Sequence, residues 1–140
     1  MIFLDTSILI AAAQSSHIHY ENSAELLRAA TRTNTACGSH SLAETYSSLS
    51  GMPKPLRLPI PAVMQVMSQV RERVKIVSLT DREYASVIEH TAASGLIGGI
   101  IFDALLIECA RKVKATRIYS WNARHFRLLA PDLANRIFTP

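Results

Sequence analysis

The stretch Ile2-Phe3-Leu4-Asp5-Thr6-Ser7 joins a short apolar run to one acidic and two hydroxyl-bearing residues, and a helix-compatible segment over residues 7–13 follows. Short apolar runs that lead directly into a helix are typical of strands buried in a parallel sheet. In such sheets, functional side chains gather beyond the carboxyl ends of the strands, where the chain leaves for the next helix. The opening of the chain therefore predicts a central strand with Asp5 at its functional end.

The remaining chain repeats this alternation of short apolar runs with helix-length amphipathic segments. Further strands are expected over residues 35–37, 74–79, 117–120 and 136–139, the last one at an edge of the sheet. Helices are expected over residues 7–13, 20–31, 41–50, 61–73, 80–94, 100–114 and 123–129. This order predicts an α/β fold in which helices cover both faces of a mostly parallel sheet.

Length and composition describe one folded unit. The chain of 140 residues fits a single domain over residues 1–140. A hydrophobic content of 49% with 19% charged residues excludes a disordered or low-complexity chain. Four prolines at positions 53, 55, 59 and 61 predict a connector between helices. The only cysteines, Cys37 and Cys109, lie in apolar runs and are expected to be buried free thiols, which excludes a disulfide framework.

The apolar N-terminus does not have the features of a signal peptide, because it lacks a basic segment and contains Asp5. No stretch reaches the roughly 18 unbroken apolar residues of a membrane span. We expect a cytoplasmic protein with no membrane segment. The net charge of +4 is compatible with a polyanionic partner, although a basic surface that is merely solvated explains it equally well. The late basic residues are Arg111, Lys112, Lys114, Arg117, Arg124, Arg127 and Arg136.

Among the eleven acidic residues, Asp5, Glu44 and Asp103 are embedded in apolar surroundings or follow a strand. Each has an ordinary structural explanation: an N-cap for Asp5, a Ser41-x-x-Glu44 capping box for Glu44, and the first turn of a helix for Asp103. Taken together, carboxylates without a nearby Lys or Arg would repel one another unless a divalent cation lay between them. Oxygen-only ligands suit Mg²⁺ or Mn²⁺, which activate water and offset phosphate charge.

Four segments in this order carry a resemblance to a known family. They are FLDTSIL at 3–9, SLAETY at 41–46, GGIIFDALLIECA at 98–110 and IYSWNARHF at 118–126. The chain resembles the PIN-domain ribonucleases found as VapC toxins in bacterial toxin–antitoxin pairs, over nearly its whole length. The resemblance implies a three-layer α/β/α sandwich around a parallel sheet and metal-dependent RNA cleavage. It also implies a homodimer and inhibition by a small antitoxin protein.

The resemblance also implies a role for individual residues. Asp5, Glu44 and Asp103 match the first, second and third acids of the family, and Asp5 and Asp103 are the expected ligands of Mg²⁺ or Mn²⁺. Asn122 stands where many members have a fourth acid, so it could orient water but adds no charge for a second metal ion. Supporting roles fall to Ser7 and Ser120.

Arg124 closely follows Asn122 and is expected to contact the RNA backbone.

Three alternatives compete with this interpretation. A Ser39-His40-Ser41 nucleophile–base pair is disfavoured, because neighbouring residues on a strand point to opposite faces and no nucleophile elbow is present. The other histidines lack metalloprotease spacing and are expected to be ordinary, although His17 or His19 could touch RNA. Aspartate-nucleophile phosphatases need a second Asp where Ser7 stands. The remaining alternative is a PIN-like module that binds RNA or protein without catalysis, as Asn122 would allow.

Overall fold

The apolar run at the start of the chain forms β1 (Ile2–Leu4), the central strand of a five-stranded parallel sheet. In this computed structural model, which describes all residues from Met1 to Pro140, the strand order is β3-β2-β1-β4-β5. The other strands are β2 (Thr35–Gly38), β3 (Lys75–Val77), β4 (Arg117–Tyr119) and β5 (Ile137–Phe138). Every neighbouring pair is parallel, and β5 lies at an edge. The predicted sheet is confirmed.

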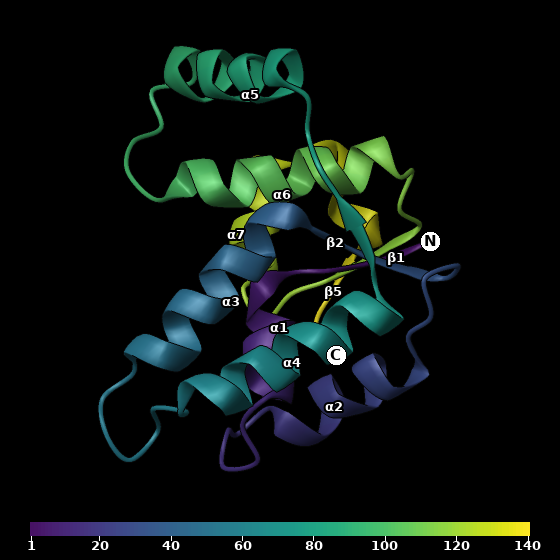
Figure 1. Cartoon of the computed structure of the whole chain (residues 1–140). Coiled ribbons are helices and arrows are strands. Elements are labelled where there is room, and N and C mark those ends of the chain that lie inside the picture. The colour runs from purple at the N-terminus through teal and green to yellow at the C-terminus, as the bar shows by residue number, and fades with distance from the viewer.

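Helices cover both faces of this sheet (Figure 1). Two consecutive residues of β1 point to opposite faces of the sheet, and each face has its own core cluster. Phe3 packs in a cluster with residues from α6 and α7, whereas Leu4 packs in a second cluster with residues from α1 and α4. The three-layer α/β/α architecture is therefore confirmed. The helices are α1 (Thr6–Ala12), α2 (Tyr20–Ala29), α3 (Ser39–Gly51), α4 (Ile60–Arg73), α5 (Asp81–Ala93), α6 (Ile100–Lys112), α7 (Ala123–Leu129) and the 3₁₀ helix η1 (Pro131–Arg136).

The start of α3 differs from the prediction. The helix begins at Ser39, directly after β2, so Ser41 lies inside the helix and the Ser41–Glu44 capping box is wrong. The Ser39-His40-Ser41 segment is consequently helical and not part of a strand. Gly38 precedes the helix, and a Cβ at this position would lie only 2.6 Å from Cδ2 of Leu106 on α6. Close packing of α6 against β2 thus requires a glycine here.

Helix α5 forms an additional layer that lies on α6 and not on the sheet (Figure 1). Its only buried residue is Thr91. Thr80 and Glu83 form a capping box at the start of the helix, and Gly95, with a φ of +68°, follows its end. The proline-rich segment connects α3 to α4, as predicted.

Both cysteines are buried and free, which confirms the prediction. Burial raises the pKa of Cys37 to about 12 and that of Cys109 to about 11, so both remain neutral thiols at physiological pH. No helix combines the length and the apolar character that crossing a membrane requires.

Candidate active site

Asp5 lies directly after the central strand, at the carboxyl edge of the sheet, and only 4% of it is exposed. Its Oδ2 accepts hydrogen bonds from Ser7 Oγ at 2.6 Å and from Ser120 Oγ at 2.7 Å. Ser7 belongs to α1 and Ser120 follows β4, so two elements fix one carboxylate. Asp5 occupies the N-cap position of α1, but its side chain makes no capping hydrogen bond, so an N-cap role alone does not account for it.

Burial raises the pKa of Asp5. Hydrogen bonds from Ser120 and Ser7, together with the nearby backbone N–H groups of Thr6 and Ser7, lower it only in part. No Lys or Arg contributes to this balance, so the ionised carboxylate is stabilised by hydroxyl and amide dipoles alone.

Glu44 is oriented by a contact between α3 and α1. Oε2 of Glu44 accepts a hydrogen bond of 2.7 Å from Thr6 Oγ1, which also lies 3.0 Å from Ser41 Oγ. On the other side, His40 Nε2 lies 4.0 Å from Oε1 of Glu44, and the His40 ring stacks on Phe102. This tertiary contact replaces the expected capping box as the reason for the position of Glu44.

Asp103 lies in the first turn of α6, where its Oδ2 is 2.7 Å from Nδ1 of His125 on α7. An ionised carboxylate only accepts hydrogen bonds, so Nδ1 donates. The side-chain amide of Asn122 lies 3.1 Å from the same nitrogen. The sequence predicted an ordinary surface or partly buried histidine at this position and did not indicate the contact with Asp103. The two residues lie on different helices, so no local spacing points to it.

The acids influence one another electrostatically. Burial is the main reason why the pKa of Asp103 is raised, and the charge of Asp5 raises it further. His125 lowers this pKa, while the more distant Glu44 raises it slightly. The three carboxylates therefore share one region of negative potential, to which no Lys or Arg contributes.

The donors in this region suit a hard divalent cation. They are carboxylates, the hydroxyls of Ser7 and Ser120 and the amide oxygen of Asn122, which match Mg²⁺ or Mn²⁺ better than zinc. In this conformation no three His, Cys, Asp or Glu side chains converge tightly enough to enclose an ion. Each acid instead has its own hydrogen-bond partner. The chemistry of the donor set thus fits a metal ion that would draw the acids together.

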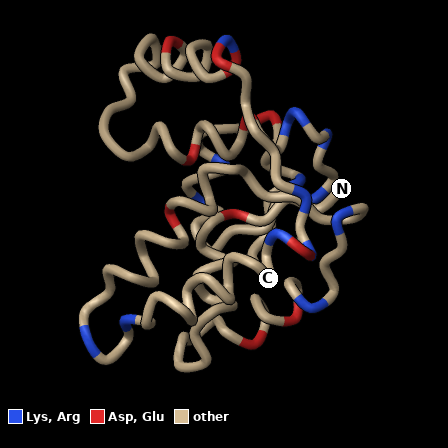
Figure 2. The backbone as a smooth tube through the Cα atoms, in the orientation of Figure 1, with Lys and Arg blue, Asp and Glu red and all other residues tan.

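Most of the late basic residues lie away from the acids. Arg117 pairs in register with Ile2, at the end of β1 opposite to Asp5. Many of the Lys and Arg positions in Figure 2 accordingly lie on the side of the molecule where the N-terminus is drawn. Arg124 is the exception, because it is exposed on the first turn of α7 and lines a shallow groove with Asn122, His125 and Leu128.

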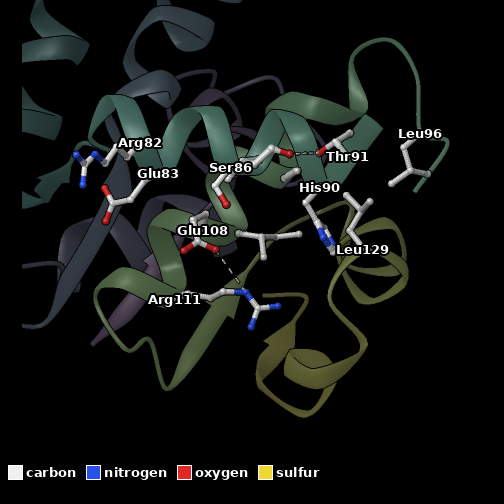
Figure 3. A pocket seen from close by; sticks show the side chains of 12 residues that line it. Arg82, Glu83, Ser86, His90, Thr91, Leu96, Glu108, Arg111 and Leu129 are labelled. Carbon is white, nitrogen blue, oxygen red and sulfur yellow. Dashed lines mark hydrogen bonds and ion pairs between the residues drawn. The ribbon is translucent and has the colours of Figure 1, made fainter. Parts of the chain in front are cut away.

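The largest cavity, of about 530 Å³, does not lie at the acids. It lies between α5 and α6, with Val87, Ile107 and Leu129 among its apolar lining residues (Figure 3). Charged side chains such as Arg82 and Arg111 also line it.

Fold and site together define a three-layer α/β domain with an acidic site at the carboxyl edge of its parallel sheet. The chain belongs to the PIN domain family, whose model matches residues 2–130. Among curated proteins, it is 28% identical over 106 residues to ribonuclease VapC40 of Mycobacterium tuberculosis. That alignment covers 76% of this chain and 75% of VapC40.

Solved structures share the fold. VapC20 of Mycobacterium tuberculosis, a toxin that cleaves the sarcin–ricin loop, gives a TM-score of 0.69 at 18% identity, covering 84% of this chain and 87% of that one. VapBC2 of Rickettsia felis, bound to a DNA fragment from its promoter, gives a TM-score of 0.57 at 24% identity. The match covers 91% of this chain and 92% of that one. FitAcB of Neisseria gonorrhoeae gives a TM-score of 0.63 at 14% identity, and the match covers 100% of this chain and 98% of that one.

Proposed function

We propose that this PIN domain is an endoribonuclease that depends on Mg²⁺ or Mn²⁺ and acts as the toxin of a toxin–antitoxin pair. The observation that carries the proposal is the group of carboxylates at the carboxyl edge of the sheet. Asp5 and Asp103 have raised pKa values, and Asp103 is affected by both Asp5 and Glu44. Such mutual repulsion without a Lys or Arg is what a divalent cation relieves. The likeness to VapC40 supports RNA as the substrate.

Each residue of the acidic site has a role in the proposed reaction. Asp5 and Asp103 hold the cation, which when bound would supply charge compensation at the scissile phosphate and activation of water. Ser7 and Ser120 orient the Asp5 carboxylate through their hydroxyls. His125 holds Asp103 in place, and Glu44 faces the same region from α3 as the third acid. Asn122 orients water without adding charge.

The proposed partners follow from the relatives. VapBC2 and the FitA–FitB assembly resemble this chain in fold, which supports a cognate antitoxin protein as the inhibitor. We also propose a homodimer, and action in the cytoplasm, where cellular RNA is accessible.

A second candidate function is a PIN-like module that binds RNA or protein without cleaving it. The observation in its favour is Asn122, which places an uncharged amide where many family members have a fourth acid. A short reading frame upstream that encodes a DNA-binding antitoxin would favour the toxin over this alternative.

The decisive experiment incubates total RNA with the purified chain and Mg²⁺ or Mn²⁺, with and without a chelator, and maps the new RNA ends. We expect discrete cleavage sites that disappear with the chelator. The D5N variant should be inactive, whereas E83Q, which changes an acid outside the site, should cleave as the wild type does. Cleavage that persists in the chelator would contradict the metal dependence, and no cleavage under any condition would favour the binding module.

A further inference from the structure

Three aromatic side chains, His17, His19 and Trp121, form an aromatic cluster that the proposed chemistry does not use. The rings of His19 and Trp121 are stacked, with centroids 3.6 Å apart and planes only 8° from parallel. The His17 ring lies 5.5 Å from that of His19 at an angle of 47°. All three residues are partly exposed, and Trp121 is the only tryptophan in the chain.

The aromatic cluster lies immediately beside Asp5. Trp121 follows Ser120, and its backbone N–H donates to Ser7 Oγ at 3.1 Å. Both of these serine hydroxyls donate to the Asp5 carboxylate. Ser7 therefore links the backbone of Trp121 to Asp5. The next residue, Asn122, contacts His125, the partner of Asp103, through its side-chain amide.

Trp121 is held rigidly in this position. Its indole Nε1 donates to the buried Ser23 Oγ on α2 at 2.8 Å, and its ring packs against the apolar cluster around Leu4. A ring that is already fixed in position loses little conformational entropy when a ligand binds to the aromatic cluster that contains it. The structural role of Trp121, which ties α2 to the β4–α7 connection, is therefore established.

His19 has no comparable structural role. It occupies the N-cap position of α2, but its side chain makes no capping hydrogen bond. Its imidazole instead covers one face of the Trp121 indole, so that a base would stack on the outer face of His19 and not on Trp121 itself. The neighbouring residue Ile18 is 89% exposed. A polar aromatic ring that is stacked and still partly exposed is the kind of surface on which nucleic-acid bases stack.

We propose that the aromatic cluster binds an unpaired RNA base next to the phosphate that is cleaved. This inference rests on the proposed function and adds a base-binding residue to it, His19, beside the site of cleavage. Bases in a duplex already stack on their neighbours and cannot present a free face, whereas bases in loops and single strands can. Stacking tolerates all four bases, so the aromatic cluster selects unpaired structure and not sequence. Arg124, which lines a groove together with Asn122, would contact the phosphate backbone of the RNA that continues from this base.

The single tryptophan makes a direct test possible without cleavage. In the presence of a chelator, the emission of Trp121 is followed while a short single-stranded RNA, the same sequence as a duplex, or inorganic polyphosphate is added. We expect the single strand to change the emission at concentrations where the duplex and polyphosphate do not. An equal response to all three would overturn the proposal, because it would report phosphate binding alone.

Variants of His19 separate stacking from folding. With labelled single-stranded RNA, H19A should bind about 5- to 100-fold more weakly than the wild type, as expected for loss of an aromatic stacking partner. H19F keeps a flat ring and should restore binding. The control H90A removes an exposed histidine on α5 and should bind as the wild type does. Melting temperatures of all variants show whether a loss reflects unfolding.

The same variants distinguish this proposal from the proposed function. If the wild type cleaves RNA and H19A matches it in binding and in KM, the stacking site is overturned and the nuclease assignment stands. The aromatic cluster would then be a structural tie or a contact for a protein partner. If single strands change the Trp121 emission but no RNA is cleaved with any metal, the nuclease assignment fails and the stacking site stands.

Discussion

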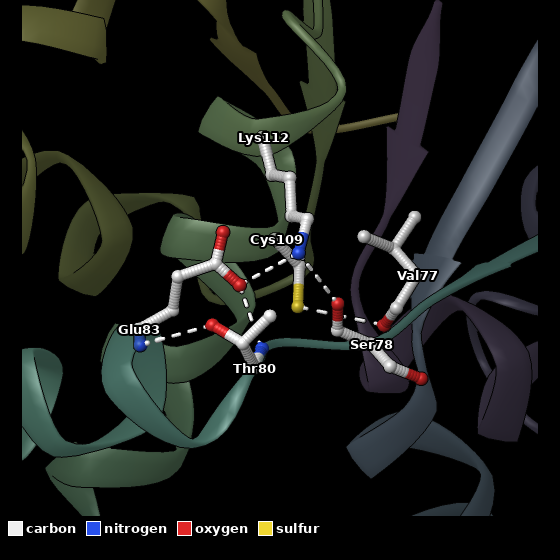
Figure 4. A network of polar contacts seen from close by, with 6 residues as sticks. All are labelled: Val77, Ser78, Thr80, Glu83, Cys109 and Lys112. Atoms are coloured by element: carbon white, nitrogen blue, oxygen red, sulfur yellow. Dashed lines mark hydrogen bonds and ion pairs between the residues drawn. The ribbon is translucent and has the colours of Figure 1, made fainter.

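The acids at the carboxyl edge of the sheet and the acids around α5 and α6 differ in their ion pairing and in the direction of their pKa shifts. Glu83 accepts from Lys112 Nζ at 2.6 Å and from its own cap at Thr80, and these contacts lower its pKa to about 2 (Figure 4). Asp132 forms a two-pronged ion pair with Arg111, which likewise lowers its pKa. Asp5 and Asp103 have no such cation, and their pKa values are raised.

This difference separates acids that hold the structure from acids that are kept for a ligand. The Lys112 ammonium also donates to the Ser78 carbonyl at 3.0 Å, so the Glu83 network joins the start of α5 to the end of α6 (Figure 4). At the sheet edge the basic neighbours of the acids are histidines, His125 beside Asp103 and His40 beside Glu44, and no Lys or Arg forms an ion pair there. Carboxylates whose pKa values are raised by burial and by one another are typical of functional sites.

The largest expected effect is the loss of cleavage on removing a charge from the sheet edge. We expect D5N and D103N each to lower the cleavage rate by roughly 100-fold or more, since even residues that merely support metal ligands cost about 10–100-fold. Burial raises the folded pKa of Asp5 above its ordinary value of 3.8, so its ionisation removes stability as pH rises through that window. At neutral pH the melting temperature of D5N should therefore equal or exceed that of the wild type. Wild-type cleavage by either variant would refute the site.

Glu44 tests whether the third acid belongs with this group. E44Q keeps an oxygen that can accept from Thr6 Oγ1 but loses the charge. We expect cleavage to fall by about tenfold or more while the melting temperature remains nearly constant. Rate and thermal unfolding are measured on the same preparation. An unchanged rate would place Glu44 with the structural acids.

A thermal shift with Mn²⁺ tests the comparison without RNA. A cation at ten times its dissociation constant should stabilise the wild type by about 1.4 kcal/mol. For a chain of this size that corresponds to a rise of about 3–6 °C in melting temperature. D103N should show a much smaller rise, whereas E83Q should respond as the wild type does. Equal shifts in all three proteins would show that the ion binds elsewhere.

Two arginines provide a smaller, matched test. Arg124 is exposed beside the site, while Arg111 is neutralised by Asp132. In a D5N background, R124Q should weaken RNA binding a few-fold and reduce the salt slope by about one. R111Q should leave RNA binding unchanged. If R124Q binds RNA with unaltered affinity and salt dependence, Arg124 is not a phosphate contact.

The smallest expected effect concerns the structural acid Glu83. Its folded pKa is lowered from 4.5 to about 2, so its contribution to stability is present above pH 4.5 and disappears as pH falls toward 2. Because the pair with Lys112 is exposed to solvent, E83Q should lower the melting temperature by a few degrees at most at pH 7. The difference from the wild type should vanish in acid. Urea unfolding across this pH range measures it, and a constant difference would contradict the ion-pair origin.

The sequence predicted the layers of the fold because short apolar runs and amphipathic helices alternate clearly along the chain. The sequence did not distinguish two similar capping patterns, Ser41-x-x-Glu44 and Thr80-x-x-Glu83, of which only the second forms a cap. Thr80 follows irregular chain after β3, so its helix starts anew and the local cap forms. Ser41 follows a strand that runs straight into a helix at Ser39, so the helix had already begun. The capping pattern at Ser41 does not reveal this earlier start, because Ser39 has no side-chain cap before it.

At the site, the residues with a motif were identified, and their partners were not. The hydrogen bond from Thr6 to Glu44 and the contact of His125 with Asp103 connect segments far apart in the chain. Neither follows from the spacing of residues within one helix. The stacking of His19 on Trp121 likewise depends on how α2 lies against the β4–α7 connection. Such partners require the tertiary structure.

The central position of β1 has a consequence for the order in which the molecule is assembled. Ile2 pairs with both Thr35 and Arg117, and the Asp5–Ser120 hydrogen bond spans 115 positions. The first strand to be synthesised is therefore among the last to obtain all its neighbours, and such distant pairings slow folding. Asp5 stays without Ser120 until β4 has left the ribosome. For the proposed ribonuclease, this order of assembly delays completion of the active site until β4 has been translated.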